Sequence, residues 1–93
     1  MTDALIDFLA NLSALPPGYS EGEFDGRRYG VTVRASKDGK RIWLYGEALG
    51  GPDRVSCNLY RLEGGRCLLK PCEMAADKVV DFVRRFRPDA SSA

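Results

Sequence analysis

The spacing of the apolar residues changes at Pro16-Pro17-Gly18, and this change most constrains what the chain can fold into. Before this point, apolar residues recur every three or four positions, which is the spacing of one face of an α-helix. We therefore expect an amphipathic helix over residues 3–14, which ends before the prolines because the residue preceding a proline avoids helical backbone angles. The apolar face consists of Leu5, Phe8, Leu9 and Leu12.

From Arg27 onward, apolar and polar residues alternate, which is the pattern of strands with one buried face. Glycine-containing turns interrupt the alternation at residues 36–40 and 63–65, and such short turns join antiparallel strands. We interpret residues 19–26, which are polar and acidic, as a connection with room for a short extra strand around Phe24. The alternating segments predict strands at residues 27–35, 41–47, 55–62 and 66–70.

A second amphipathic helix is expected over about residues 73–86, with acidic residues early and arginines late, as the helix dipole favours. Together these elements predict an α+β fold, in which a three- to four-stranded antiparallel meander carries an N-terminal and a C-terminal helix on one face (α-β-β-β(-β)-α). A chain of 93 residues is long enough for one domain. We assign this domain to residues 1–88 and a frayed tail to residues 89–93.

The side of the predicted sheet opposite the helices carries the functional hypothesis. If the aliphatic side chains face the helices, three aromatic and three arginine side chains are left on a surface with no obvious cover, and large exposed aromatics usually mark an interface. This face consists of Arg28, Thr32, Arg34, Arg41, Trp43, Tyr45, Glu47, Ser56, Asn58 and Tyr60. The predicted binding residues among them are Arg28, Arg34, Arg41, Trp43, Tyr45, Asn58 and Tyr60.

Two kinds of partner fit such a face. A second copy of the chain, or another protein, would bury the aromatic and arginine residues that dominate interface hot spots. A single-stranded nucleic acid would stack its bases on the rings while the arginines contact phosphates. In a third, purely structural interpretation, Trp43 and Tyr45 pack against cross-strand neighbours and are covered by the acidic connection or the tail. We expect a non-enzymatic binding module that self-associates or binds a protein, with nucleic-acid binding as the alternative.

Charge is unevenly distributed along the chain. All fourteen basic residues lie in residues 27–93, whereas the charged residues of 1–26 are all acidic. The formal net charge of +1 therefore hides a basic part, and the acidic start could lie against the basic remainder of the same molecule or of a neighbour. Arg84, Arg85 and Arg87 are candidate anion contacts, although their position near a helix C-terminus would explain them equally well.

The chain has no histidine, which excludes Ser-His, Cys-His and histidine-ligated metal chemistry. Among the three cysteines, Cys57 falls on the core side of its strand, whereas Cys72 precedes the second helix, whose dipole would lower the pKa of a thiol. Cys72 is therefore the candidate for a minor thiol-based activity. The cysteines lack the paired spacing of a zinc site, and the glycine pairs lack the spacing of phosphate loops, so we predict no metal and no cofactor.

The N-terminal residues bear on location. They are apolar but contain Asp3 and Asp7 and no early basic residue, which is unlike a secretory signal. No apolar run approaches the ~18 residues that span a bilayer, and the odd number of cysteines does not resemble a disulfide framework. We therefore expect a cytoplasmic protein with reduced thiols and no membrane partner.

Overall fold

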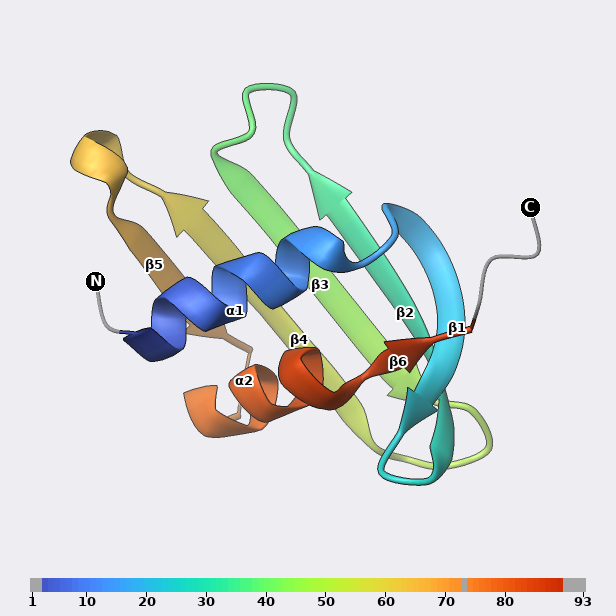
Figure 1. Ribbon diagram of the computed structural model, residues 1–93. Coiled ribbons are helices and arrows are strands. Elements are labelled where there is room, and N and C mark those ends of the chain that lie inside the picture. Colours follow the sequence, from blue (N-terminus) through green and yellow to red (C-terminus); the bar gives the residue numbers. More distant parts are fainter. Residues whose placement is uncertain (1–2, 73, 90–93) are drawn as a thin grey trace.

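The computed structural model describes residues 3–72 and 74–89 of the chain (Figure 1). Within these residues, the fold is of the predicted α+β class and contains two helices and one six-stranded antiparallel sheet, so the predicted count of three to four strands is wrong. The elements are α1 (Asp3–Ala14), β1 (Gly18–Phe24), β2 (Arg27–Ala35), β3 (Arg41–Ala48), β4 (Arg54–Arg61), the 3₁₀ turn η1 (Glu63–Gly65), β5 (Cys67–Pro71), α2 (Ala76–Arg85) and β6 (Arg87–Pro88).

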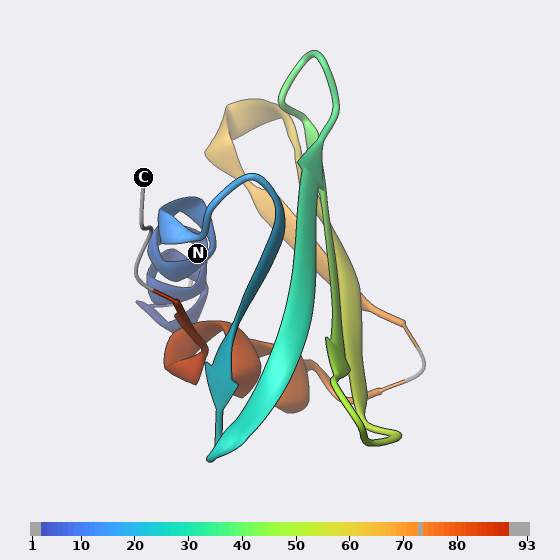
Figure 2. The ribbon, with the colours of Figure 1, turned by 90° about the vertical axis from the view of Figure 1, so that its right-hand side faces the viewer.

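The sheet has the strand order β5-β4-β3-β2-β1-β6, and every neighbouring pair is antiparallel. Strands β1 to β5 follow one another across the sheet as a meander, because each connection is a short turn. After α2 the chain returns to the opposite edge, where β6 pairs with β1. Both helices lie on the same side of the sheet, and Figure 2 shows the other side without a helix.

The hydrophobic core lies between the helices and the sheet. Phe82 of α2 is at its centre: it is 0% exposed, and its ring lies 4.8–5.3 Å from the rings of Phe24, Tyr29 and Phe86. Gly46 of β3 makes room for this ring, because a Cβ at that position would lie 3.2 Å from it. The other buried residues of the core are Phe8, Leu12, Leu15, Val31, Leu44, Ala48, Val55, Cys57, Leu59, Val79 and Val83.

Residues 19–26 do not form the predicted connection, because most of them belong to β1. The inward positions of this strand include Ser20 and Gly22, so small side chains conceal the hydrophobic alternation that marks the other strands. Gly22 has a structural role. A Cβ there would clash with the carbonyl oxygen of Arg87 and lie 2.7 Å from the Cα of Pro88. The close approach of β6 to β1 therefore requires a glycine at position 22.

The predicted bounds of the helix 3–14 and the strand 27–35 are confirmed, whereas the ends of the later elements move by up to three residues. The second helix begins at Ala76, because Ala75 has extended backbone angles (φ −70°, ψ 145°) and no side chain caps the helix. It ends before Phe86, whose extended backbone leads into β6 instead of continuing the helix. Position 73, where the helix was predicted to start, lies outside the described residues.

The predicted frayed tail begins with a residue that is anchored. Asp89 donates its backbone N–H to the carbonyl oxygen of Glu21, over 2.9 Å, and so extends the contact between β6 and β1. The remainder of the predicted tail, residues 90–93, lies outside the described residues.

The two helices are short, at 12 and 10 residues. In the part of the chain that the structure describes, neither helix has the length and apolarity needed to cross a membrane. Each instead contributes buried side chains to the core, such as Phe8 from α1 and Val79 from α2.

Asp53 ties the loop between β3 and β4 to α2. The hydroxyl of the buried Tyr29 donates to one oxygen of its carboxylate, and Lys78 Nζ lies 2.7 Å from the other. The hydrogen bonds from Lys78 and Tyr29 lower the pKa of Asp53. Burial and the bond to Asp53 raise the pKa of Tyr29 to about 12. This network fixes the end of the sheet at which β3 turns into β4.

Candidate functional site

We refer to the side of the sheet that faces away from the helices as the open face (Figure 2). On β3, Leu44 is 2% exposed and belongs to the core, whereas its neighbours Trp43 and Tyr45 are 37% and 42% exposed. The pairing of β3 with β4 runs without interruption along both strands, so no bulge swaps the two sides. Trp43 and Tyr45 therefore lie on the open face, where strand alternation predicts them.

The strand register arranges the side chains of the open face in four rows that cross the strands. The first row is Arg41, Tyr60 and Leu68, and the second is Arg34, Trp43, Asn58 and Lys70. The third row is Tyr19, Thr32, Tyr45 and Ser56, and the fourth is Glu21, Gly30, Glu47 and Arg54. Six of the predicted binding residues lie together in the first three rows, while Arg28 lies beyond the fourth row, opposite Glu23.

Arg41 connects the aromatic side chains of the first two rows. Its guanidinium carbon lies 4.0 Å from the centre of the Trp43 ring and 5.8 Å from that of Tyr60. Its Nη2 also donates to Oδ1 of Asn58, over 3.2 Å. A cation–π contact at an exposed site stabilises by about 0.5–1 kcal/mol. Arg41 therefore orients Trp43 and covers part of its ring, which leaves this guanidinium less free to bind an external anion.

Tyr19 belongs to the open face, although it was not predicted as a site residue. It is 59% exposed, and its ring lies over Gly30, where a Cβ would be 3.0 Å from the ring carbons. Its hydroxyl donates to Glu21 over 3.1 Å, and the hydroxyl of Tyr45 lies 3.4 Å from Glu47. The alternation of Tyr19 and Glu21 with small residues is the sequence signal that could have revealed this strand and its exposed ring.

The open face is electrically uneven. The described side chains of the first two rows include three bases and no acid, and we refer to these rows as the basic half; the bases are Arg34, Arg41 and Lys70. The fourth row and the pair beyond it include the acids Glu21, Glu23 and Glu47 and the bases Arg28 and Arg54. Because Arg28 is paired with Glu21 and Asp89, we refer to this part as the acidic half. Trp43 and Tyr45 lie side by side on β3, at the boundary between the two halves.

Arg28 was predicted to anchor an anion, but its guanidinium is occupied within the molecule. Nη1 and Nη2 each donate to an oxygen of Asp89 over 2.7 Å, and Glu21 lies 3.6 Å away. The hydrogen bonds from Arg28 lower the pKa of Asp89. The acidic N-terminal segment was expected to lie against basic residues of the same molecule or of a neighbour. The pair of Arg28 with Glu21 places one of its acids against a base of the same molecule.

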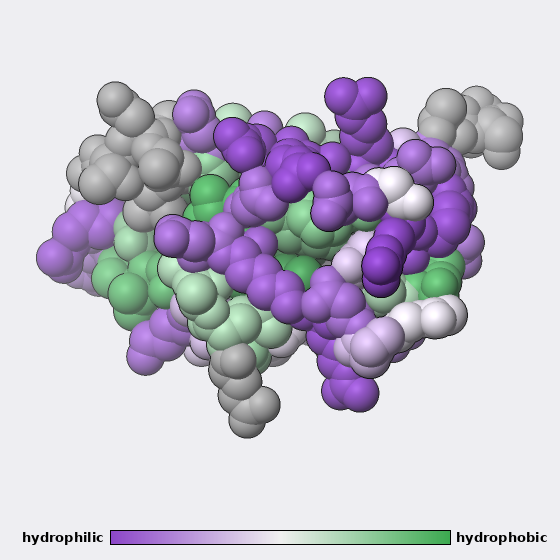
Figure 3. Space-filling view, turned by 90° about the horizontal axis from the view of Figure 1, so that it is seen from below, coloured by the Kyte–Doolittle hydropathy of each residue, from purple (hydrophilic) through white to green (hydrophobic). Residues whose placement is uncertain are grey.

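Arg84, Arg85 and Arg87 lie elsewhere, at the end of the molecule where α2 approaches the β1–β2 turn. Figure 3 shows this end from below, and hydrophilic residues cover most of it. Arg84 donates to Asp81 over 2.8 Å, and Arg85 binds Asp81 and Asp25 over 3.0 and 2.9 Å. Two of the three candidate anion contacts therefore already have carboxylate partners within the molecule.

The three thiols differ in exposure: Cys57 is buried, Cys67 is intermediate and Cys72 is exposed. Cys72 is exposed and lies 3.8 Å from the amide nitrogen of Asn58, at the rim of the open face. Cys72 was predicted to lie directly before the second helix, but α2 begins four residues later, at Ala76. Cys57 is buried, and burial raises its pKa to about 12. Among the described residues, no three His, Cys, Asp or Glu side chains form a group that could hold a metal ion.

In comparisons with protein-family models, curated proteins and solved structures, none matches this chain. The geometry and charge of the open face therefore carry the functional proposal.

Proposed function

We propose that this chain is a non-enzymatic self-association module whose open face binds the open face of a second copy. The observation that carries the proposal is the exposure of Trp43 and Tyr45 at the middle of a six-stranded sheet, between a basic and an acidic half. Rings at the centre of a patch with polar residues around them are typical of interface hot spots. A two-fold axis would use the same patch twice, as in most homodimers.

Charge selects one orientation for the second copy. If the two-fold axis lies between the two faces and runs across the strands, the strands of the two copies are antiparallel and the basic half of each lies over the acidic half of the other. On β3, Trp43 then lies opposite Tyr45 of the second copy, and Arg41 lies opposite Glu47. An axis parallel to the strands would instead place like charges together, which costs free energy. Packed sheets deviate from this alignment by about 30° because they twist.

A single-stranded nucleic acid is the alternative occupant of the same face. The three basic side chains near Trp43 favour it, since a groove with aromatic rings for stacking nucleobases and basic side chains for binding phosphates is typical of single-strand binding. Two features favour the second copy instead. Arg41 lies over the Trp43 ring that a nucleobase would stack on. The carboxylates of Glu21 and Glu47 lie beside the two exposed tyrosines, where they would repel phosphates.

Sedimentation equilibrium from micromolar to submillimolar concentration tests the proposal. We expect a monomer–dimer equilibrium that Trp43→Ala abolishes and that Leu49→Ala, a change of an exposed residue in the β3–β4 loop, leaves unchanged. A wild-type chain that stays monomeric throughout this range would contradict self-association. Binding of a labelled single-stranded oligonucleotide, with the steep loss of affinity in salt that phosphate contacts produce, would support the alternative.

A pair of charge reversals tests the orientation. Arg41→Glu alone and Glu47→Arg alone should each weaken the dimer, because each places two like charges opposite each other twice. An equimolar mixture of the two variants should dimerise better than either variant by itself, because a mixed dimer restores both opposite-charge contacts. A mixture that associates no better than the separate variants would refute the antiparallel orientation.

A further inference from the structure

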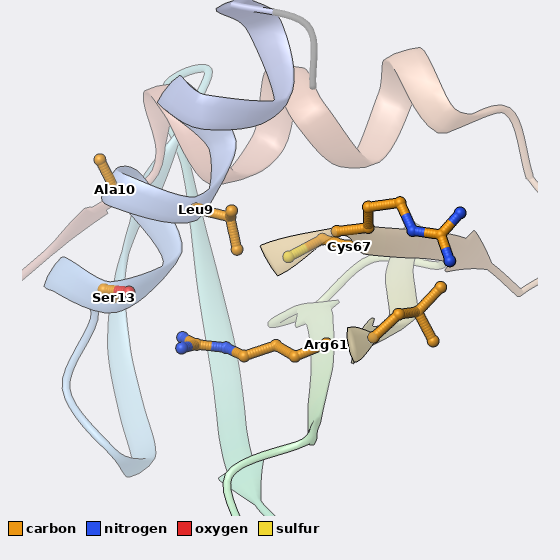
Figure 4. A pocket seen from close by; sticks show the side chains of 7 residues that line it. Leu9, Ala10, Ser13, Arg61 and Cys67 are labelled. Carbon is orange, nitrogen blue, oxygen red and sulfur yellow. The ribbon is translucent and has the colours of Figure 1, made fainter. Parts of the chain in front are cut away.

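A cavity of about 320 Å³ lies on the helix side of the sheet, away from the open face. It separates the second half of α1 from the β4–β5 turn, as Figure 4 shows. Leu9, Ala10 and Ser13 of α1 form one wall, and Arg61, Leu62, Arg66 and Cys67 form the other. The cavity is at the lower end of the range of ligand pockets, about 300–1,000 Å³, so it suits a single slender molecule.

The part of the cavity that is next to the hydrophobic core is apolar. Leu9 and Cys67 pack against the core while remaining partly exposed, and the exposed Leu62 continues the apolar wall towards solvent. In Figure 4 the sulfur of Cys67 and the side chain of Leu9 point towards each other across the cavity. An aliphatic chain of a ligand would remove this apolar surface from water, at about 25 cal/mol for each Å² buried.

The rim of the cavity is positive. Arg61 follows Val55, Cys57 and Leu59 on the inward side of β4, where the preceding strand positions are aliphatic. Figure 4 shows its side chain extended towards Ser13 of α1. Arg66 is the second base of the rim. Among the described residues, no carboxylate forms an ion pair with either guanidinium, in contrast to Arg28, Arg84 and Arg85.

We propose that this cavity binds an amphiphilic carboxylate with a single aliphatic chain, such as a medium-chain fatty acid. The chain lies between Leu9, Leu62 and Cys67, and the carboxylate accepts hydrogen bonds from the guanidinium of Arg61 at the rim. A single arginine guanidinium binds a planar carboxylate through two parallel hydrogen bonds, which gives such a site its preference for this headgroup. The site is on the opposite side of the sheet from the proposed dimer surface, so either proposal stands if the other fails.

Titration with decanoate below its micelle concentration, followed by amide chemical shifts, tests the site. We expect saturable binding of one decanoate, with shifts concentrated in the second half of α1 and in the β4–β5 turn. Decanol shares the chain but lacks the charge, and acetate shares the charge but lacks the chain, so each should bind at least tenfold more weakly. Decanol binding as tightly as decanoate, or shifts that never saturate, would overturn the proposal.

Variants separate the two parts of the site. Arg61→Gln should lower decanoate affinity by about tenfold and leave decanol binding unchanged. Ala10→Phe should fill the apolar part from an exposed helix position and lower affinity for both. Arg54→Gln, which removes an exposed base from the other side of the sheet, is the matched control and should have no effect. Equal loss in Arg54→Gln and Arg61→Gln would show that only overall charge matters and would refute the site.

Discussion

The two faces of the sheet are built from alternate residues of the same strands, yet their side chains are kept in place by different interactions. On the helix side, Leu44, Val55 and Leu59 are at most 2% exposed, and their burial stabilises the fold. On the open face, Trp43 is held by Arg41, and Tyr19 and Tyr45 lie beside carboxylates. The difference teaches that the side chains that stabilise the fold lie on one side of the strands and the exposed rings on the other. If the open face binds a partner as proposed, substitutions should separate stability from binding.

The largest effect should come from Phe82, at the centre of the helix-covered side. Phe82→Ala removes a ring that contacts three other aromatic rings and should lower the free energy of unfolding by about 3–5 kcal/mol. Trp43→Ala should lower it by only about 1 kcal/mol, since the residue is 37% exposed and its cation–π contact with Arg41 lies at an exposed site. Urea unfolding of both variants measures the contrast, and equal losses would break the division between the faces.

The next effect concerns the edge at which β6 joins the sheet. Gly22→Ala places a Cβ where the backbone of Arg87 and Pro88 already lies, and should cost about 1–3 kcal/mol as β6 shifts away. Amide exchange of Asp89, whose N–H bonds to Glu21, should become faster. Gly51→Ala is the control, because its Cβ would meet nothing closer than 3.5 Å. Unchanged stability in Gly22→Ala would mean that β6 does not need the close approach.

The Asp53 network should make stability fall at both ends of the pH range. The pKa of Asp53 is lowered in the folded state, so its contribution is present above the unfolded value of about 3.9 and is lost as pH falls through the folded value. The pKa of Tyr29 is raised to about 12, so its contribution is present below the unfolded value of about 10 and is lost as pH rises towards 12.

Two variants test whether Asp53 causes the loss of stability at acidic pH and Tyr29 the loss at alkaline pH. Asp53→Asn should cost about 1–2 kcal/mol at pH 7 and flatten the acidic limb of the stability profile. Tyr29→Phe keeps the buried ring and should flatten the alkaline limb. Urea midpoints measured from pH 3 to pH 11 provide the check. Acidic and alkaline limbs that persist unchanged in the respective variants would show that other groups cause them.

The smallest effect should come from the open face itself. Asp89→Asn removes the two exposed hydrogen bonds from Arg28 and should lower stability less than Asp53→Asn does, because exposed ion pairs contribute little and are screened by salt. The loss should shrink further at high salt. A loss larger than that of Asp53→Asn would mean that the open face contributes to stability more than its exposure suggests.

Strand parity was the part of the fold that local sequence predicted best. The alternation around Leu44 and between Val55 and Leu59 placed Trp43, Tyr45 and Tyr60 on the open face, because side chains on a strand alternate strictly. Only a short strand around Phe24 was expected where the structure has β1, because Ser20 and Gly22 leave its inward face without hydrophobic alternation. At position 22 a Cβ would clash with the backbone of β6 and the ring of Phe86.

The other features that the sequence did not predict depend on contacts between residues far apart along the chain. Arg28 pairs with Asp89, and Arg85 pairs with Asp25, residues about sixty positions away. The return of the chain after α2 brings Asp89 to Arg28, and the packing of α2 on the sheet brings Arg85 to Asp25. The same return makes a two-residue strand of Arg87 and Pro88, which no local pattern signals. The cavity beside Arg61 likewise depends on where α1 crosses the sheet.

Contacts between two copies can be observed directly in a mixture of isotope-labelled and unlabelled chains. Nuclear Overhauser effects that arise only between copies report which residues face each other across a dimer. The proposed interface predicts such effects between the indole of Trp43 and the ring of Tyr45 of the second copy. A dimer whose intermolecular effects involve the helices, or the edge strand β5 alone, would contradict the assignment of recognition to the open face.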